Sequence, residues 1–104
     1  MSEVVYTVTV SFTREPMVRA WLDWMDQGHV ADVIAGGATS AEIVQLDLPE
    51  PTFDVHYRFP SHEAFTAYER DHAPRLRAEG LKLFPTEKGV TYKRTVGRVV
   101  RTFR

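Results

Sequence analysis

The chain has 104 residues, of which 43% are hydrophobic and 26% are charged, with a formal net charge of -1. These values are typical of one globular domain spanning residues 1–104, and they argue against a disordered chain or a general polyanion binder. No apolar run approaches the roughly 18 residues of a membrane span, and the first residues carry no export signal. There is no cysteine for a disulfide or a thiolate site. We therefore expect a cytoplasmic protein.

Positive charge is concentrated at the end of the chain. Residues 93–104 contain five basic residues and no acidic residue. Valine and phenylalanine side chains alternate with these charges, which is typical of a strand and unlike a solvated basic arm that binds nucleic acid. We expect this segment to lie on the acidic body of the same chain or of a second copy.

The first strand is predicted at residues 4–12, where apolar and hydroxyl side chains alternate with a period of two. Thr13 is the expected cap of a helix with the apolar stripe Val18, Trp21, Leu22 and Met25. Gly28 weakens this helix, a short second segment follows over residues 29–35, and the glycine pair at 36–37 ends it.

A hairpin is predicted in the middle of the chain. Residues 41–48 and 53–59 are the two strands, and the turn at 49–51 contains two prolines. Because the connection is so short, the two strands should pair antiparallel.

Ser61 is the expected cap of the next helix, which should break near His72 because Pro74 disfavours helical geometry in the residue before it. The helix can restart at Pro74 and run to Gly80. A last long strand is predicted over residues 90–103. The order βαββαβ predicts an α+β, ferredoxin-like fold with a four-stranded antiparallel sheet and both helices on one face.

The two-residue period also predicts which face of the sheet the helices cover. The set containing Tyr6 and Phe59 should face the helices, and the set containing Thr9, His56 and Arg58 should face away. The last strand is apolar on both faces, so we expect a homodimer in which the two open faces meet around a polar space. His56, as a proton carrier, and Arg58 and Thr9, as ligand contacts, are the first candidates for a site that binds a small polar or anionic molecule. The alternative for Arg58 is an ion pair with Asp54 or with an acid of the partner.

Three segments carry a family resemblance: WLDWMDQGH (residues 21–29), DVIAGGATSAEI (32–43) and YERDHAPRLR (68–77). Through them the chain resembles an uncharacterised bacterial family of short ferredoxin-like proteins within the dimeric α+β barrel superfamily. The resemblance implies this fold and a dimer. Related barrels include cofactor-free monooxygenases, haem-degrading enzymes, small isomerases and proteins without known activity.

Two residues of the first helix are further candidates. His29 can act as a general base at the helix end, where an imidazolium is favoured and the pKa can lie near neutrality, or it can cap the helix. Trp24 lies near the edge of the apolar stripe that contains Trp21, so it is the better candidate for the rim of a pocket.

Tyr68 and His72 are one helical turn apart and share a face. This pair can relay a proton, or its hydrogen bond can lock the helix break before Pro74.

Several other kinds of site are not expected. The histidine spacing fits no metal motif, and no glycine-rich phosphate loop or serine elbow is present, so we expect no metal and no cofactor. Three functions remain: a small-molecule enzyme or binder, a dimerisation or regulatory module without chemistry, and an RNA-binding domain. RNA binding ranks last, because the outward set of the first and third predicted strands contains no aromatic side chain for base stacking.

Overall fold

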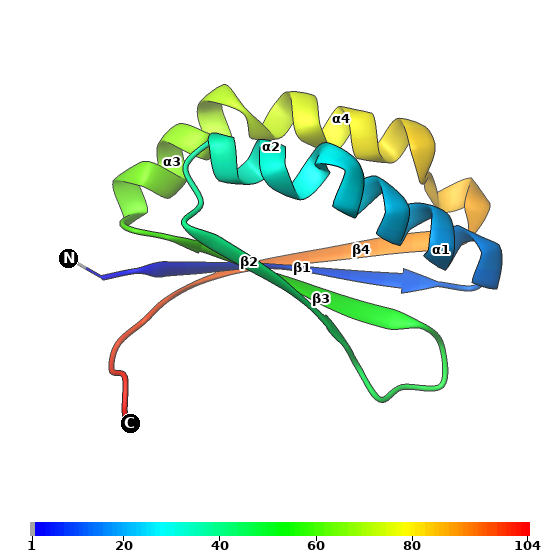
Figure 1. The fold of residues 1–104 in the computed structure, drawn as a ribbon, viewed down its shortest axis with the longest axis horizontal. Helices are drawn as coiled ribbons and strands as arrows, with labels where there is room; N and C mark the ends of the chain where they lie inside the picture. Colours follow the sequence, from blue (N-terminus) through cyan, green and yellow to red (C-terminus); the bar gives the residue numbers. More distant parts are fainter. Residues whose placement is uncertain (1) are drawn as a thin grey trace.

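The structure is a computed structural model, and it describes residues 2–104. One antiparallel sheet forms a layer, and all the helices lie on one side of it (Figure 1). The strands are β1 (Val4–Phe12), β2 (Ser40–Gln45), β3 (Thr52–Phe59) and β4 (Val90–Arg98). The helices are α1 (Glu15–Trp24), a π-helix (Met25–His29), α2 (Val30–Ala35), α3 (His62–Asp71), α4 (Ala73–Leu83) and a 3-10 turn (Thr86–Lys88).

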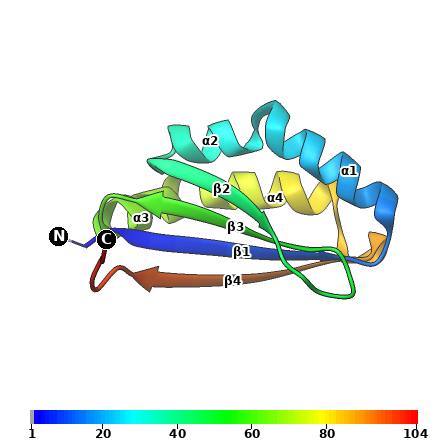
Figure 2. The same ribbon diagram turned by 60° about the horizontal axis from the view of Figure 1, so that its bottom comes forward.

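The sheet has the strand order β2-β3-β1-β4, with the two strands nearest to the chain ends in the sequence, β1 and β4, side by side (Figure 2). Every neighbouring pair is antiparallel. The register places Tyr6 opposite Tyr57 and Thr9 opposite Asp54. The βαββαβ order and the ferredoxin-like arrangement predicted from the sequence are confirmed.

The hydrophobic core lies between the sheet and the helices. The inward set predicted for β1 and β3 is buried there, apart from Val8, which is partly buried against the core. Trp21 of α1 is 2% exposed, and its ring lies 5.5 Å from both Phe12 and Phe53. On the other half of the sheet, Phe65 of α3 packs 5.2 Å from Phe59. The alternation in the two central strands therefore assigned the sheet faces correctly.

The connection from α1 to α2 follows the prediction of a helix weakened at Gly28. Residues 25–29 form a π-helical stretch, and the backbone is kinked at Gly28, whose φ of 164° and ψ of -26° are not helical. Such bulges are often found beside functional sites, because the extra residue redirects the neighbouring side chains. Here the bulge lies between Trp24 and His29, two of the candidate residues.

Helix ends follow the prediction in one case and not in another. The Ser61 side chain accepts a hydrogen bond from the Ala64 N–H at 3.1 Å, as expected for a cap. Thr13 does not cap α1: the cap position is Arg14, and the Thr13 hydroxyl instead donates to the Gly89 carbonyl at 3.4 Å. The break at His72 is confirmed, and α4 extends three residues beyond Gly80.

The last strand is shorter than predicted, because β4 ends at Arg98 and residues 99–104 have no ladder partner in the described chain. The Val99 N–H still donates to the Glu3 carbonyl at 2.9 Å. Beyond it, Val100 and Phe103 are 76% and 85% exposed. The alternating apolar residues of this tail predicted a strand. The ladder ends at Arg98 because the neighbouring strand, β1, begins at Val4. Among residues 2–104, no helix has the length and apolar composition to cross a bilayer.

Candidate functional site

A small cavity lies between the sheet and the helices, on the covered side of the sheet. Its volume is about 50 Å³. Strands β1, β3 and β4 form its floor, and α1, the π-helix, α2, α3 and α4 form its walls. Its aromatic and polar lining comprises Tyr6, Trp21, Trp24, His29, Tyr57, Tyr68, Arg77, Tyr92 and Arg94. Three candidate residues, Trp24, His29 and Tyr68, are thus brought to one cavity.

His29 and Trp24 form one end of this cavity. Their rings are stacked, with centroids 4.1 Å apart and an angle of 23° between the planes. The Nδ1 atom of His29 is buried and has no hydrogen-bond partner among the described residues. Burial lowers the pKa of His29 to about 4, although the charge of Asp32 partly offsets this effect. At neutral pH the imidazole is therefore uncharged and able to accept a proton.

The predicted imidazolium with a pKa near neutrality is thus wrong for His29. The prediction assumed that the helix stops there, so that its last carbonyls favour a positive charge. His29 instead follows the kink at Gly28 and has helical dihedral angles at the start of α2, so it does not lie at the last carbonyls of a helix. For the same reason His29 is not a helix-terminating cap.

Arg77 and the tyrosines form the opposite wall. The Arg77 Nη2 donates to the Tyr6 hydroxyl at 3.2 Å and to the Glu69 carboxylate at 2.8 Å. The Arg77 Nε is buried without a partner among the described residues. Burial raises the pKa of Tyr68 to about 12, with a further contribution from Tyr6, and burial likewise raises the pKa of Tyr57. The phenols therefore stay protonated and can donate hydrogen bonds.

A wider depression lies on the surface beside the cavity, with a volume of about 470 Å³. Trp24 and His29 belong to the lining of both spaces, so this stacked pair separates the inner cavity from the outer depression. Gly80 of α4 makes room for the pair, because a Cβ atom at that position would lie 3.3 Å from the Trp24 ring.

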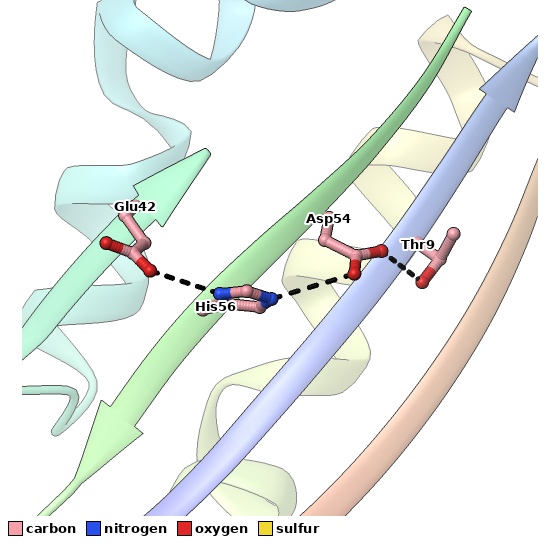
Figure 3. Close-up of polar contacts among 4 residues, drawn as sticks. All are labelled: Thr9, Glu42, Asp54 and His56. Carbon is pink, nitrogen blue, oxygen red and sulfur yellow. Dashed lines mark hydrogen bonds and ion pairs between the residues drawn. The ribbon is translucent and has the colours of Figure 1, made fainter. Parts of the chain in front are cut away.

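Two further candidate residues, Thr9 and His56, lie on the open face of the sheet (Figure 3). His56 is held between two carboxylates: its Nδ1 is 3.2 Å from Glu42 and its Nε2 is 3.6 Å from Asp54. The Thr9 hydroxyl donates to the other oxygen of Asp54 at 2.6 Å. These four side chains form one connected row across β2, β3 and β1.

Arg58 lies on the same open face but outside that row. Its guanidinium is 3.3 Å from Glu3. The expected alternative for Arg58, an ion pair with an acid, is therefore present, with Glu3 in place of Asp54. Within this chain, His56 and Arg58 are each directed at carboxylates, and neither lines the cavity under the helices.

His72 does not belong to the lining of the cavity, whereas Tyr68 does. The two rings are stacked at 6.3 Å with 14° between their planes, and the His72 backbone N–H donates to the Tyr68 carbonyl at 2.9 Å. Ring stacking and this backbone bond thus take the place of the expected side-chain hydrogen bond at the helix break. No group of three or more histidine, cysteine, aspartate or glutamate side chains with the geometry of a metal site occurs in residues 2–104.

Three residues of the cavity wall were not predicted from the sequence as site residues: Tyr6, Tyr57 and Arg77. Tyr6 and Tyr57 were treated only as core residues because of their strand parity. The available signal was the phenolic hydroxyl, since a buried tyrosine normally needs a polar partner. Arg77 belongs to the YERDHAPRLR segment and lies one turn beyond Ala73 on the helix face that meets the sheet, where an arginine is unusual.

The chain matches a known protein family over most of its length. Residues 3–98 match the sequence profile described as "Domain of unknown function (DUF4286)". The chain belongs to the DUF4286 family. No curated protein sequence matches this DUF4286 chain significantly.

Solved structures share the fold of this DUF4286 protein. A dimeric ferredoxin-like protein from an uncultured marine organism has a TM-score of 0.76 at 11% identity, covering 99% of this chain and 100% of that one. SnoaB, a cofactor-independent oxygenase from Streptomyces nogalater, has a TM-score of 0.70 at 13% identity, covering 98% and 97%. A Streptomyces coelicolor monooxygenase in complex with nanaomycin D has a TM-score of 0.72 at 13% identity, covering 99% and 92%. At such identities these similarities establish the shared fold.

Proposed function

We propose that this protein is a small-molecule enzyme that binds a planar aromatic compound in the cavity under the helices and takes a proton from it. The observation that carries the proposal is a pair of buried nitrogen atoms without partners, His29 Nδ1 and Arg77 Nε, on the wall of one aromatic cavity. Buried polar groups normally have hydrogen-bond partners. Two unpartnered nitrogens on residues that line the same cavity therefore favour a polar ligand there.

The size of the cavity sets a condition on binding. A cavity needs a volume of about 10–15 Å³ to hold one water molecule. A cavity of about 50 Å³ therefore holds a few water molecules but is too small for an aromatic ring. An aromatic ligand needs the additional volume of the outer depression. The Trp24–His29 stack must therefore move, and the π-helix beside it supplies a local irregularity where such movement is least costly.

The chemistry of the wall fits proton abstraction. Neutral His29 accepts the proton, and the guanidinium of Arg77 stabilises the anion that forms. A substrate anion of this kind can react directly with O2, which is the reaction class of a cofactor-independent oxygenase. Support for this class comes from the fold shared with SnoaB and the coelicolor monooxygenase.

Anthrone is a suitable probe, because its ring CH2 group is acidic. With O2 it gives anthraquinone and water, so that one oxygen atom enters the new carbonyl group and the other leaves as water. We expect the wild-type protein to accelerate O2 uptake in an oxygen electrode above the buffer rate. His29→Gln should lower this acceleration by about 100-fold, the typical contribution of a general base. His62→Gln, a substitution on the exposed start of α3, is the matched control and should keep the full rate.

Two results would contradict this proposal. One is O2 uptake that never exceeds the buffer rate, and the other is an unchanged rate in His29→Gln. Quenching of tryptophan fluorescence by anthrone shows separately whether the variant still binds the probe, since Trp24 forms part of the wall.

We also propose that the open face of the sheet pairs with the same face of a second copy. Val100 and Phe103 are exposed in the tail that follows β4, and a structural relative is described as dimeric. The polar space between the sheets would then hold His56, Arg58 and Thr9 from each copy, which keeps them as candidates for a second ligand contact. Light scattering should give twice the 11.9 kDa chain mass; the single-chain mass at micromolar concentration would contradict this pairing.

A dimerisation module without chemistry is the second candidate function. The row from Glu42 to Thr9 favours it, because its hydrogen bonds and ion pairs are satisfied within one chain. A dimer that binds no aromatic probe would support the module and contradict the enzyme.

A further inference from the structure

We infer that the ligand of the cavity carries a carboxylate group, held by Arg77 and Arg94 at the edge between α4 and β4. This inference rests on the proposed function and adds the substrate class. No aspartate or glutamate belongs to the lining of the cavity, whereas two arginines do. An uncharged aromatic ligand would leave the charge of Arg94 and the Nε donor of Arg77 without a counterpart.

Arg94 is available for such a contact. It lies on β4 opposite Val8, so it belongs to the helix-facing side of the sheet. Its guanidinium is placed 5.5 Å from the centre of the Tyr92 ring, a cation–π contact that leaves its N–H groups unused. Among residues 2–104, no carboxylate forms an ion pair with it within 4.0 Å.

Arg77 is only partly neutralised. Its Nη2 is shared between Tyr6 and Glu69, so this nitrogen is occupied. Its Nε, buried at the cavity, is the unused donor. A guanidinium with one free edge can bind a carboxylate oxygen there while it keeps its bonds to Tyr6 and Glu69.

The sheet register brings the two arginines to the same wall. Tyr6 lies opposite Val96 on β4, and Arg94 is two residues away on the same face. Diagonal neighbours of this kind have Cβ atoms about 7–8 Å apart or less, which long side chains can span. Because Arg77 is hydrogen-bonded to Tyr6, its guanidinium lies within this neighbourhood. The charges of Arg77 and Arg94 both act on Tyr68, where they oppose the rise in the Tyr68 pKa that burial causes.

The aromatic and anionic parts of the ligand would thus occupy different ends of the site. The ring would lie beside Trp24 and His29, where the unpartnered imidazole nitrogen is found. The carboxylate would lie toward β4, at Arg77 and Arg94. Aromatic carboxylic acids are the compound class that this arrangement fits.

A matched pair of fluorescence-quenching titrations tests the inference. The probes are 1-naphthol and 1-hydroxy-2-naphthoate, which share a ring and a hydroxyl and differ in the carboxylate. At low salt the wild-type protein should bind the naphthoate about tenfold more tightly, and the preference should shrink as salt is added, because Arg94 is exposed. Arg94→Gln should lose most of this preference and bind 1-naphthol as the wild type does.

Arg98→Gln is the matched control. It removes the same charge from the same face of β4, but Arg98 is not part of the cavity lining. It should keep the preference for the naphthoate. Arg77→Gln should also lose the preference; because this variant gives up the bonds to Tyr6 and Glu69, its folding is checked by its 1-naphthol affinity.

The possible failures are distinguishable. Equal affinity of the wild type for the two probes overturns the carboxylate inference and leaves the proposed aromatic site in place. A preference that Arg94→Gln and Arg98→Gln reduce equally also overturns it, because a general charge effect then explains the result. Binding of neither probe overturns the proposed function together with the inference.

Discussion

The two faces of the sheet are built from alternate residues of the same strands, yet their polar groups are used in different ways. On the open face, Glu42, His56, Asp54 and Thr9 are joined in a row of short contacts (Figure 3). On the covered face, His29 and Arg77 each keep a buried nitrogen without a partner. The helices make this difference, because they exclude the water that would otherwise satisfy such groups. Unused hydrogen-bonding capacity, more than charge, distinguishes the covered face as the candidate site.

The largest expected effect concerns the stability of the covered face. Trp21→Ala removes a side chain that is 2% exposed and packed against Phe12 and Phe53. The loss of buried area and the resulting void should lower the free energy of unfolding by about 3–5 kcal/mol. Urea denaturation followed by circular dichroism measures it. A loss below about 1 kcal/mol would mean that the helices do not cover this half of the sheet as described.

The second effect is the pH dependence of stability, which should come from the covered face. The folded protein takes up a proton on His29 near pH 4, whereas the unfolded chain takes it up near the ordinary pKa of 6.5. The unfolded state therefore binds more protons between these values, and stability falls as the pH is lowered from 6.5 to 4. The loss is up to about 3 kcal/mol.

His29→Gln should remove this part of the slope in unfolding curves recorded from pH 7 to pH 4. His62→Gln should keep it, because that side chain is exposed in both states. If the free energy of unfolding depends on pH in His29→Gln as it does in the wild type, the interpretation is wrong.

The smallest effect concerns the open face. His56→Ala breaks contacts with Glu42 and Asp54, but the His56 side chain is 32% exposed. Partly exposed ion pairs contribute little, so the free energy of unfolding should fall by less than about 1 kcal/mol. A loss of several kcal/mol, measured in the same urea titration, would mean that these contacts form a buried polar network. The polar groups of the open face would then resemble those of the covered face.

The fold was largely predictable from local patterns. The alternation in β1 and β3, the serine cap of α3 and the proline after His72 each act over a few residues, and each is confirmed. The end of β4 was not predictable from its own residues. A strand continues only where a neighbour offers backbone groups, and β1 begins at Val4.

The candidate site was only partly predictable. The helical period predicted that Trp24 lies at the edge of the apolar stripe. In the structure Trp21 and Trp24 both line the cavity, but Trp21 is buried in the core, whereas Trp24 also borders the outer depression. The meeting of His29 with Arg77 and the tyrosines was not visible, because these residues come from five elements far apart in the chain. In the sequence, the tyrosines also resembled ordinary core residues, and Arg77 resembled a surface arginine.

The amino-acid sequence alone determined the order of the elements and the face of the sheet that each strand residue occupies, because side-chain periodicity is a local property of the backbone. Tertiary structure decided the neutral state of His29, the two unpartnered nitrogens and the cavity they share. Desolvation and hydrogen bonding depend on what surrounds an atom in space, and only the packed helices and sheet establish those surroundings.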